Sequence, residues 1–314
     1  MVCFRSGRRY ACSVPELPDL TVYVERLGAL FAGKPLQGVR VKSPFVVRTY
    51  DPPLSDAVGR QLSSLFLVGK RLVFVLEPEL YLVFHLMISG RFHLKGPGAA
   101  LGKIGLLSLD FAESSLLLTE ASSRKRASLH VVRTRAEALA MDRGGVAPLS
   151  SSLEELTRAL RVENRTLKRA LTDPRIISGV GNAYSDEILF RAKLSPMKRT
   201  HDLGDEEIAR LVAAMKSVLE EWIARLRAEV GQGFPEKVTA FHDEMSVHGR
   251  FKKPCRVCGS PVQRIVYAQN ECNYCATCQT GGKLLADRAL SRLLHGDWPK
   301  TLEELEERKT AGAR

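Results

Sequence analysis

The sequence predicts an α+β fold built from several domains, and three patterns along the chain carry this prediction. Residues 62–132 contain short runs rich in Leu, Val, Phe and Ile that turn residues interrupt, as in antiparallel sheets. Farther along, apolar residues recur at helical spacing as far as about residue 230. Five of the seven cysteines then crowd into residues 255–278. We therefore expect a sheet domain, a helical domain and a small cysteine-rich unit.

An amphipathic helix over residues 18–32 opens the sheet domain. Pro18 falls near its first turn and Gly33 follows its end, where these residue types favour the start and the stop of a helix. Its apolar side chains recur at helical spacing, at Leu20, Val24, Leu27, Leu30 and Phe31. The strands that follow are clearest at residues 72–76 and 106–111.

Changes of pattern also predict the domain boundaries. Residues 144–152, rich in Gly, Pro and Ser, separate the strands from the helices. We assign the sheet domain to residues 15–133, a linker to 134–150, the helical domain to 151–250 and the cysteine-rich unit to 251–282. A helical tail is expected over residues 283–314, where Thr301 and Glu304 have the spacing of a capping box.

Composition favours a polyanionic partner. The chain has 47 Lys and Arg against 35 Asp and Glu, a net charge of +12, and a pI near 9.5. A generally basic soluble protein remains the alternative interpretation of the charge alone. No apolar run reaches the roughly 18 residues that span a membrane, and residues 1–13 lack the apolar segment of a signal peptide. We expect a cytosolic protein.

The cysteines predict a structural zinc site. A cytosolic protein keeps its thiols reduced, which argues against disulfides. Cys255 and Cys258 form one Cys-x2-Cys pair, and Cys275 and Cys278 form another after sixteen intervening residues. Four thiolates at this spacing can surround one zinc ion and fold a hairpin that is too small for a hydrophobic core. Cys272 and Cys275 also have the Cys-x2-Cys spacing, so this second pair of zinc ligands remains possible.

Four segments together resemble the formamidopyrimidine-DNA glycosylase and endonuclease VIII family over roughly residues 15–280. They are Pro15–Leu20, His85–Gly90, Gly179–Glu187 and the two cysteine pairs, in the order of that family. The resemblance implies an N-terminal antiparallel β-sandwich with a catalytic helix, a helix-two-turn-helix domain and a zinc β-hairpin. It also makes Cys272 a bystander and implies one structural Zn²⁺.

The same resemblance implies a bifunctional DNA glycosylase and abasic-site lyase of base excision repair. Such an enzyme removes oxidised or ring-opened bases from double-stranded DNA and nicks the strand by β/δ-elimination through a Schiff base. Pro15 would be the nucleophile, Glu16 the general acid that opens the deoxyribose ring, and Lys70 the contact to the phosphate flanking the lesion. A terminal amine titrates near pH 8, so roughly a tenth is neutral at pH 7. A bacterial, nucleoid-associated monomer is expected.

The helical domain supplies three further candidates. Asn182, in the loop between two predicted helices, is the expected phosphate contact, because backbone amides at a helix start favour anions. Lys168 and Glu187 match positions that approach the extruded base in relatives. Either of them could equally be an exposed helical charge.

Several positions depart from the family pattern. Ile88 stands where relatives usually carry a wedging Met, and Arg126 retains the intercalating arginine but precedes Ala127 in place of an aromatic residue. Asn270 replaces an arginine that grips phosphates in relatives, and it supplies neither a charge nor a bidentate fork. Whether an oxidised purine or pyrimidine is preferred stays open.

Fourteen residues precede Pro15, whose nitrogen is then a planar amide. Val14 suggests a GTG start codon, so we expect translation to begin there, with loss of the initiator Met and residues 1–14 as a mis-annotated extension. Proteolytic trimming would have the same effect. A genuine extension would instead leave a non-catalytic damaged-DNA-binding protein, and a zinc-ribbon adaptor of another nucleic-acid complex is the remaining alternative.

Overall fold

The structure is a computed structural model that describes residues 2–5, 8–11, 14–236, 242–267, 270–285, 299–304 and 307. The chain divides into two compact units. Unit 1 comprises residues 1–144 and 220–240, and unit 2 comprises residues 145–219 and 241–314. None of the helices in the described part has the length and apolar character that crossing a membrane requires.

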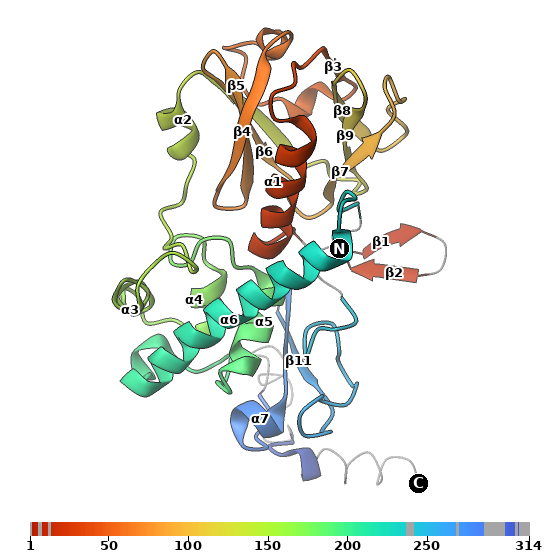
Figure 1. Ribbon diagram of the computed structural model, residues 1–314. Coiled ribbons are helices and arrows are strands. Elements are labelled where there is room, and N and C mark those ends of the chain that lie inside the picture. Colours follow the sequence, from red (N-terminus) through yellow and green to blue (C-terminus); the bar gives the residue numbers. More distant parts are fainter. Residues whose placement is uncertain are drawn as a thin grey trace. The chain divides into compact units, whose positions relative to one another are not determined.

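Unit 1 contains two four-stranded antiparallel sheets, which confirms the predicted β-sandwich (Figure 1). In one sheet the order is β10 (Ser128–Val132), β6 (Leu80–His85), β5 (Arg71–Glu77) and β4 (Gln61–Val68). In the other it is β3 (Gly38–Val41), β8 (Gly105–Asp110), β9 (Ser115–Glu120) and β7 (Gly90–Lys95). Unit 1 also contains the short helices η1 (Pro44–Val46), η2 (Leu54–Ala57) and α2 (Arg135–Leu139).

Alternation along the strands builds the core of unit 1. Leu72, Phe74 and Leu76 point from β5 into a buried cluster that also holds Phe84 and Phe92, whose rings meet edge to face at 5.3 Å. Truncating such a fully buried Phe to Ala costs about 3–5 kcal/mol. The neighbouring positions of β5 face the other side of the sheet.

Helix α1 (Leu17–Phe31) packs against β4 and β5 with its apolar face, as the spacing of its apolar residues predicts. Tyr23, Leu27 and Phe31 are fully buried there, and Phe31 stacks on Phe111 at 4.1 Å. Before α1, strands β1 (Val2–Arg5) and β2 (Arg8–Ala11) form an antiparallel hairpin. The structure therefore gives regular backbone to part of the stretch that precedes Pro15.

Unit 2 is mostly helical and ends in a β-hairpin. Its helices are α3 (Leu153–Arg161), α4 (Leu167–Thr172), α5 (Asn182–Arg191), η3 (Thr200–Asp202) and α7 (Ala276–Thr280), and its hairpin pairs β11 (Gln263–Tyr267) with β12 (Asn270–Tyr274). Helix α6 (Asp205–Val230) begins in unit 2, and its residues from 220 onward are grouped with unit 1.

The predicted tail helix lies mostly outside the described residues. Thr301 accepts a hydrogen bond from the backbone N–H of Glu304 at 3.2 Å, as a helix cap at this position requires. Thr301 is therefore the capping residue, as predicted, whereas the carboxylate of Glu304 accepts the backbone N–H of Lys300, the residue before Thr301.

Candidate active site and nucleic-acid interface

The start of α1 places the predicted nucleophile and acid in a buried setting. Pro15 is buried, and Glu16 keeps 1% of its surface exposed. The backbone N–H of Glu16 donates a hydrogen bond to Asp19 Oδ2 at 2.9 Å, which satisfies an amide at the helix start. The nitrogen of Pro15 belongs here to the peptide bond from Val14 and has no available lone pair.

Asp19 is a titratable group of this site that sequence analysis missed. Burial raises the pKa of Asp19 to about 7, although the hydrogen bond from Glu16 and the charge of Arg91 act in the opposite direction. Its carboxyl group therefore exchanges a proton close to neutral pH. Its position three residues after Glu16 was the available signal, since an acidic side chain there can accept the Glu16 N–H.

Lys70 lies in the turn that joins β4 to β5. Gly69, the residue before it, has a φ of +58°, a left-handed conformation that glycine adopts without strain. The charge of Lys70 contributes to a lowered pKa of His85, so Lys70 lies near the end of β6. The phosphate contact expected of Lys70 stays a prediction.

The segment that carries Ile88 is a tight turn between β6 and β7. The N–H of Gly90 donates to Leu86 O at 2.9 Å, and a Cβ on Gly90 would meet that oxygen at 2.2 Å, so only glycine fits here. Met87 has a φ of +54°, and Ile88 is half-buried. The turn thus holds Ile88 on a constrained backbone.

Glu120, another residue missed by sequence analysis, fixes the loop of Arg126. The residue is 1% exposed, and its carboxylate accepts hydrogen bonds from the backbone N–H groups of Arg126, at 2.8 and 3.0 Å, and of Ala127, at 3.1 Å. The Arg126 side chain is exposed. A buried carboxylate therefore positions the backbone from which this arginine projects.

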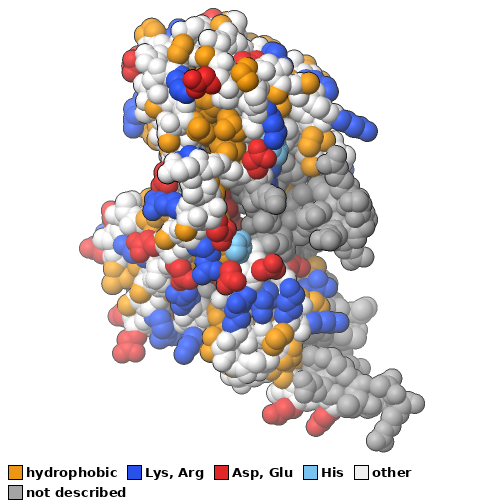
Figure 2. Space-filling view, turned by 45° about the vertical axis from the view of Figure 1, so that its right-hand side comes forward, with side chains coloured by type: hydrophobic (Ala, Val, Ile, Leu, Met, Phe, Trp, Pro, Cys, Tyr) orange, Lys and Arg blue, Asp and Glu red, His pale blue; other side chains and the backbone are white. Residues whose placement is uncertain are grey.

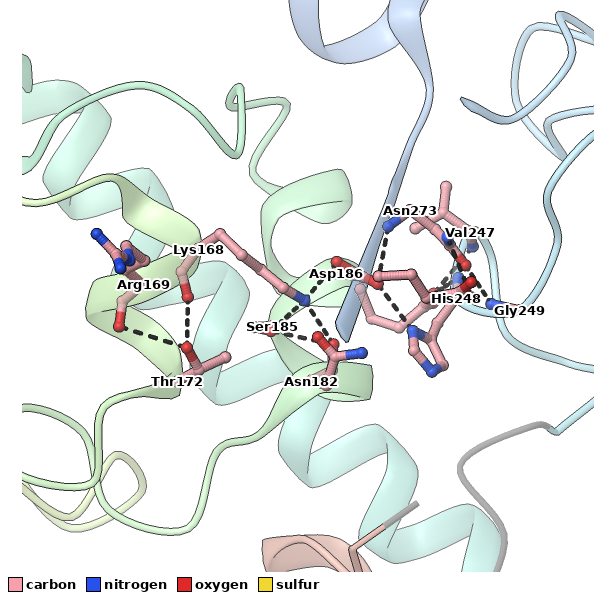
Figure 3. A network of polar contacts seen from close by, with 12 residues as sticks. Lys168, Arg169, Thr172, Asn182, Ser185, Asp186, Val247, His248, Gly249 and Asn273 are labelled. Carbon is pink, nitrogen blue, oxygen red and sulfur yellow. Dashed lines mark hydrogen bonds and ion pairs between the residues drawn. The ribbon is translucent and has the colours of Figure 1, made fainter. Parts of the chain in front are cut away.

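In unit 2, Lys168 belongs to a buried polar network (Figure 3). Its Nζ lies 2.7 Å from Asn182 O, 2.8 Å from Ser185 Oγ and 2.6 Å from Asp186 Oδ1, and 2% of the residue is exposed. These bonds join α4 to the first turn of α5. The interpretation of Lys168 as an exposed helical charge is therefore wrong, whereas its approach to an extruded base stays a prediction.

Asp186 extends this network to the β-hairpin. Its Oδ2 lies 2.8 Å from His248 Nδ1 and accepts the backbone N–H of Asn273 at 3.0 Å. Burial opposes its ionisation, but Lys168 and His248 together hold the pKa of Asp186 below its usual value. Asn273 Oδ1 in turn accepts the N–H of Gly249. One carboxylate thus ties α5 to β12 and to the loop before the cysteines.

Glu187 anchors the same loop from the next position of α5. Its carboxylate accepts backbone N–H groups of Ser246, Val247 and His248 at 2.8, 2.9 and 2.9 Å, and 4% of the residue is exposed. Glu187 is therefore no exposed helical charge either. The expected contact of Glu187 with DNA remains untested.

Asn182 is the first residue of α5 and is half-buried. Gly181 precedes the helix as its N-cap, and Gly179 has a φ of +77° in the connecting turn. A helix start favours anions, because its first backbone amides have no partner within the helix. The predicted phosphate contact is compatible with this placement.

The four predicted cysteine ligands converge in unit 2. The Sγ atoms of Cys255, Cys258, Cys275 and Cys278 all lie within 4.8 Å of one another, with 3.4 Å between Cys258 and Cys275 and 4.0 Å between Cys255 and Cys278. Tetrahedral zinc with Zn–S bonds of about 2.3 Å places sulfurs roughly 3.8 Å apart, so this group fits one ion. Cys272 is buried elsewhere, beside Ile265 and Tyr274, as its interpretation as a bystander predicts.

The thiols of this group differ in their ease of ionisation. Burial opposes ionisation of Cys258, but hydrogen bonds from Ser260 and the neighbouring thiols outweigh it and lower the pKa of Cys258 to about 6. Burial raises the pKa of Cys278 to about 11 and that of Cys275 still farther. A bound cation would reverse this penalty, because zinc binds the thiolate form.

The surface charge is mixed on the face drawn in Figure 2, where Asp and Glu side chains lie among the Lys and Arg side chains. The net charge of +12 is therefore not gathered into one uninterrupted basic surface there.

Asn270 begins β12 and pairs with Tyr267, while its side chain lies outside the described part of the structure.

Comparison with known proteins identifies matching families for both units. The formamidopyrimidine-DNA glycosylase N-terminal domain matches residues 14–134, and the formamidopyrimidine-DNA glycosylase H2TH domain matches residues 145–231. A formamidopyrimidine-DNA glycosylase of Desulfitobacterium hafniense is 31% identical over 85% of this chain and 100% of its own length. An uncharacterized formamidopyrimidine-DNA glycosylase-like protein of Mycobacterium tuberculosis is 41% identical over 48% of this chain and 93% of its own.

Solved structures share the fold. Lactococcus lactis Fpg in complex with Fapy-dG-containing DNA superposes with a TM-score of 0.76 at 24% identity, covering 84% of this chain and 100% of that one. The same protein in complex with DNA that contains an abasic site gives a TM-score of 0.74 at 22% identity, over 84% of this chain and 99% of that one.

Proposed function

Because this chain belongs to the formamidopyrimidine-DNA glycosylase family, we propose that it is a bifunctional DNA glycosylase and abasic-site lyase of base excision repair. The observation that carries the proposal is the buried placement of Pro15 and Glu16 at the start of α1, within a chain that matches glycosylases over their whole length. The substrate is double-stranded DNA with an oxidised or ring-opened base or an abasic site.

The proposed reaction needs Pro15 as the first residue of the chain. Its secondary amine then forms a bond to the sugar C1′ while the glycosidic bond breaks, and the base leaves with a proton. Glu16 protonates the ring oxygen as the sugar opens to the iminium. Loss of a C2′ proton and departure of the 3′ phosphate then nick the strand. Lys70 and Asn182 would hold the phosphates, and Arg126 with Ile88 would fill the gap left by the base.

Zinc has a structural role in this proposal. Cys255, Cys258, Cys275 and Cys278 would hold one ion that cross-links the ends of the β11–β12 hairpin. Asn270 on that hairpin would face phosphate. Lys168 in α4 and Glu187 in α5 would approach the extruded base. We place the protein as a monomer in the bacterial cytoplasm, at the nucleoid through its DNA.

A non-catalytic damaged-DNA-binding protein is the second candidate. It is favoured by the peptide bond at Pro15 and by the β1–β2 hairpin that precedes it. A zinc-ribbon adaptor without selectivity for abasic sites has no such support.

Borohydride trapping on an abasic-site duplex tests the proposal. The chain that begins at Pro15 is compared with residues 1–314, and the crosslinked peptide is identified by mass. A crosslink at Pro15 in the shorter chain alone supports the lyase. In the shorter chain, Pro15→Gly should retain some crosslinking through its primary amine. Binding without a crosslink in either chain supports the second candidate.

A further inference from the structure

Arg91, the second residue of β7, binds the backbone of the turn that carries Ile88. Its Nη1 donates hydrogen bonds to Gly90 O at 2.6 Å and to Ile88 O at 3.2 Å. The residue is half-buried, so these bonds are partly shielded from competing water. One guanidinium nitrogen therefore holds two carbonyl groups that lie on either side of Ser89.

The path of the turn is one that a free chain would not keep. Met87 has a φ of +54°, a left-handed conformation that costs a residue with a side chain roughly 1–2 kcal/mol. Such a conformation persists only where the surrounding contacts fix it. The bond from the Gly90 N–H to Leu86 O supplies one of these contacts, and the two bonds from Arg91 supply others.

The side chain of Ile88 makes this support necessary. Because isoleucine is branched at Cβ, its χ1 angle is restricted. An unbranched methionine can adjust three torsions to a misplaced backbone, whereas isoleucine cannot. The direction in which Ile88 points therefore follows the backbone of the turn, and this is the backbone that Arg91 binds.

The same guanidinium acts on the start of α1. Burial raises the pKa of Asp19 to about 7 and also raises that of Tyr23, and the charge of Arg91 opposes both shifts. Asp19 and Tyr23 are four residues apart and share one face of the helix. The ring of Tyr23 meets that of Phe92, which follows Arg91, at 6.0 Å. Arg91 thus lies between the turn and the helix start whose Glu16 N–H donates to Asp19.

The other proposed gap-filling residue is tied to the neighbouring strand. Gly90 of β7 pairs with Glu120 of β9, and the Glu120 carboxylate accepts the backbone N–H of Arg126. The turn of Ile88 and the loop of Arg126 therefore adjoin one pair of strands. A side chain that must enter a stack of bases needs its backbone held to within about 0.5 Å by supporting residues.

We propose that Arg91 is a positioning residue for base extrusion: its bonds to the carbonyls of Ile88 and Gly90 fix the turn so that Ile88 enters the gap left by the extruded base. The proposal rests on the proposed function, because a gap exists only where a base has left the stack. Arg91 acts through Ile88 and takes no part in the chemistry at the sugar.

Fluorescence of 2-aminopurine tests this proposal on the full chain and requires no reactive Pro15. The duplex carries a tetrahydrofuran abasic analogue opposite 2-aminopurine, whose emission rises when the base is unstacked. Binding of the parent protein should raise the emission to a plateau, and Ile88→Ala should remove most of that rise. Arg91→Met keeps an unbranched side chain without donors and should do the same. A variant that was merely less stable would need more protein to reach the plateau of the parent.

A double-mutant cycle shows whether Arg91 acts through Ile88. The double variant Ile88→Ala/Arg91→Met should have the plateau of Ile88→Ala alone, because the turn then has no isoleucine to direct. Losses that add in the double variant overturn the proposal, as does a parent plateau in Arg91→Met. If Arg91→Met does not fold, Arg91→Gln keeps a polar group that is too short to bridge both carbonyls. It should also lower the plateau, and the plateau of the parent would again overturn the proposal.

Arg60→Met is the matched control. Arg60 is also half-buried, and it also bridges two backbone carbonyls, those of Asp56, at 2.6 Å, and of Pro78. It precedes β4 at the opposite end of the β4–β5 pairing from Arg71, so the plateau of the parent should be retained. A plateau lowered as far as in Arg91→Met would overturn the proposal.

The lyase is decided separately by trapping at Pro15. Absence of the crosslink together with the expected plateaus would reject the lyase and keep the role of Arg91. A crosslink together with unchanged plateaus would do the reverse.

Discussion

Asp19 and Glu16 are joined by a hydrogen bond from the Glu16 N–H to Asp19 Oδ2, 2.9 Å long and buried. It fixes the backbone at the start of α1, directly after Pro15. Because the pKa of Asp19 is about 7, the charge of the carboxyl group that accepts this hydrogen bond changes with pH in the neutral range.

Asp19 should make the folded state less stable as the pH rises. A carboxyl group whose pKa goes from 3.8 to about 7 on folding binds its proton more tightly in the folded chain. The free energy of unfolding should therefore fall between about pH 4 and pH 7, by on the order of 4 kcal/mol. Asp19→Asn keeps an acceptor for Glu16 and should remove this fall.

Denaturant unfolding of parent and variant at several pH values measures the difference. Asp56→Asn, at an exposed position, is the control and should follow the parent. Parallel pH profiles for the parent and Asp19→Asn would show that Asp19 does not titrate in this range.

The ion pair of Lys168 and Asp186 should be sensitive to the loss of either member. Both side chains are at most 3% exposed, so Asp186→Ala leaves a buried ammonium without its carboxylate and should cost about 3–5 kcal/mol of unfolding free energy. Asp205→Ala removes the partner of Arg161 at the surface, where Asp205 is 96% exposed, and should cost less than about 1 kcal/mol. Equal costs in the two variants would contradict a buried network that holds the hairpin to α5.

The helices and strands could be predicted from local pattern, whereas the buried polar residues could not. The helix expected at residues 18–32 is observed as Leu17–Phe31, and the run at residues 72–76 lies within β5. Periodicity and caps suffice for these because the signal is local. Asp186 gains its role from residues 168, 248 and 273, so no local pattern contains it.

The cysteine group could be predicted because its spacing is itself the constraint of the site. Glu120 shows the opposite case, since only the folded loop brings its carboxylate to the backbone of Arg126. An isolated Glu at a strand end carries no such information.

Zinc content should depend on Cys275 and not on Cys272. Cys275→Ser removes one of the four converging sulfurs, so zinc should be released and DNA binding should weaken as the hairpin loses its cross-link. Cys272→Ser should retain one equivalent of zinc, because Cys272 packs beside Ile265 and Tyr274. Metal analysis of both purified variants measures this. If Cys275→Ser retained zinc and Cys272→Ser lost it, Cys272 rather than Cys275 would be the zinc ligand.

Asn270→Arg should strengthen binding to abasic DNA. Asn270 begins β12, on the hairpin whose Asn273 N–H donates to Asp186, and an arginine there adds a charge and a planar fork. At moderate salt the affinity should rise, and the slope of log K against log salt should steepen by about 0.9 if one phosphate contact is gained. Asn270→Gln changes the size of the side chain without adding charge and is the matched control. Binding curves at four or more salt concentrations decide the matter, and a slope shared by all three proteins would show that position 270 does not face phosphate.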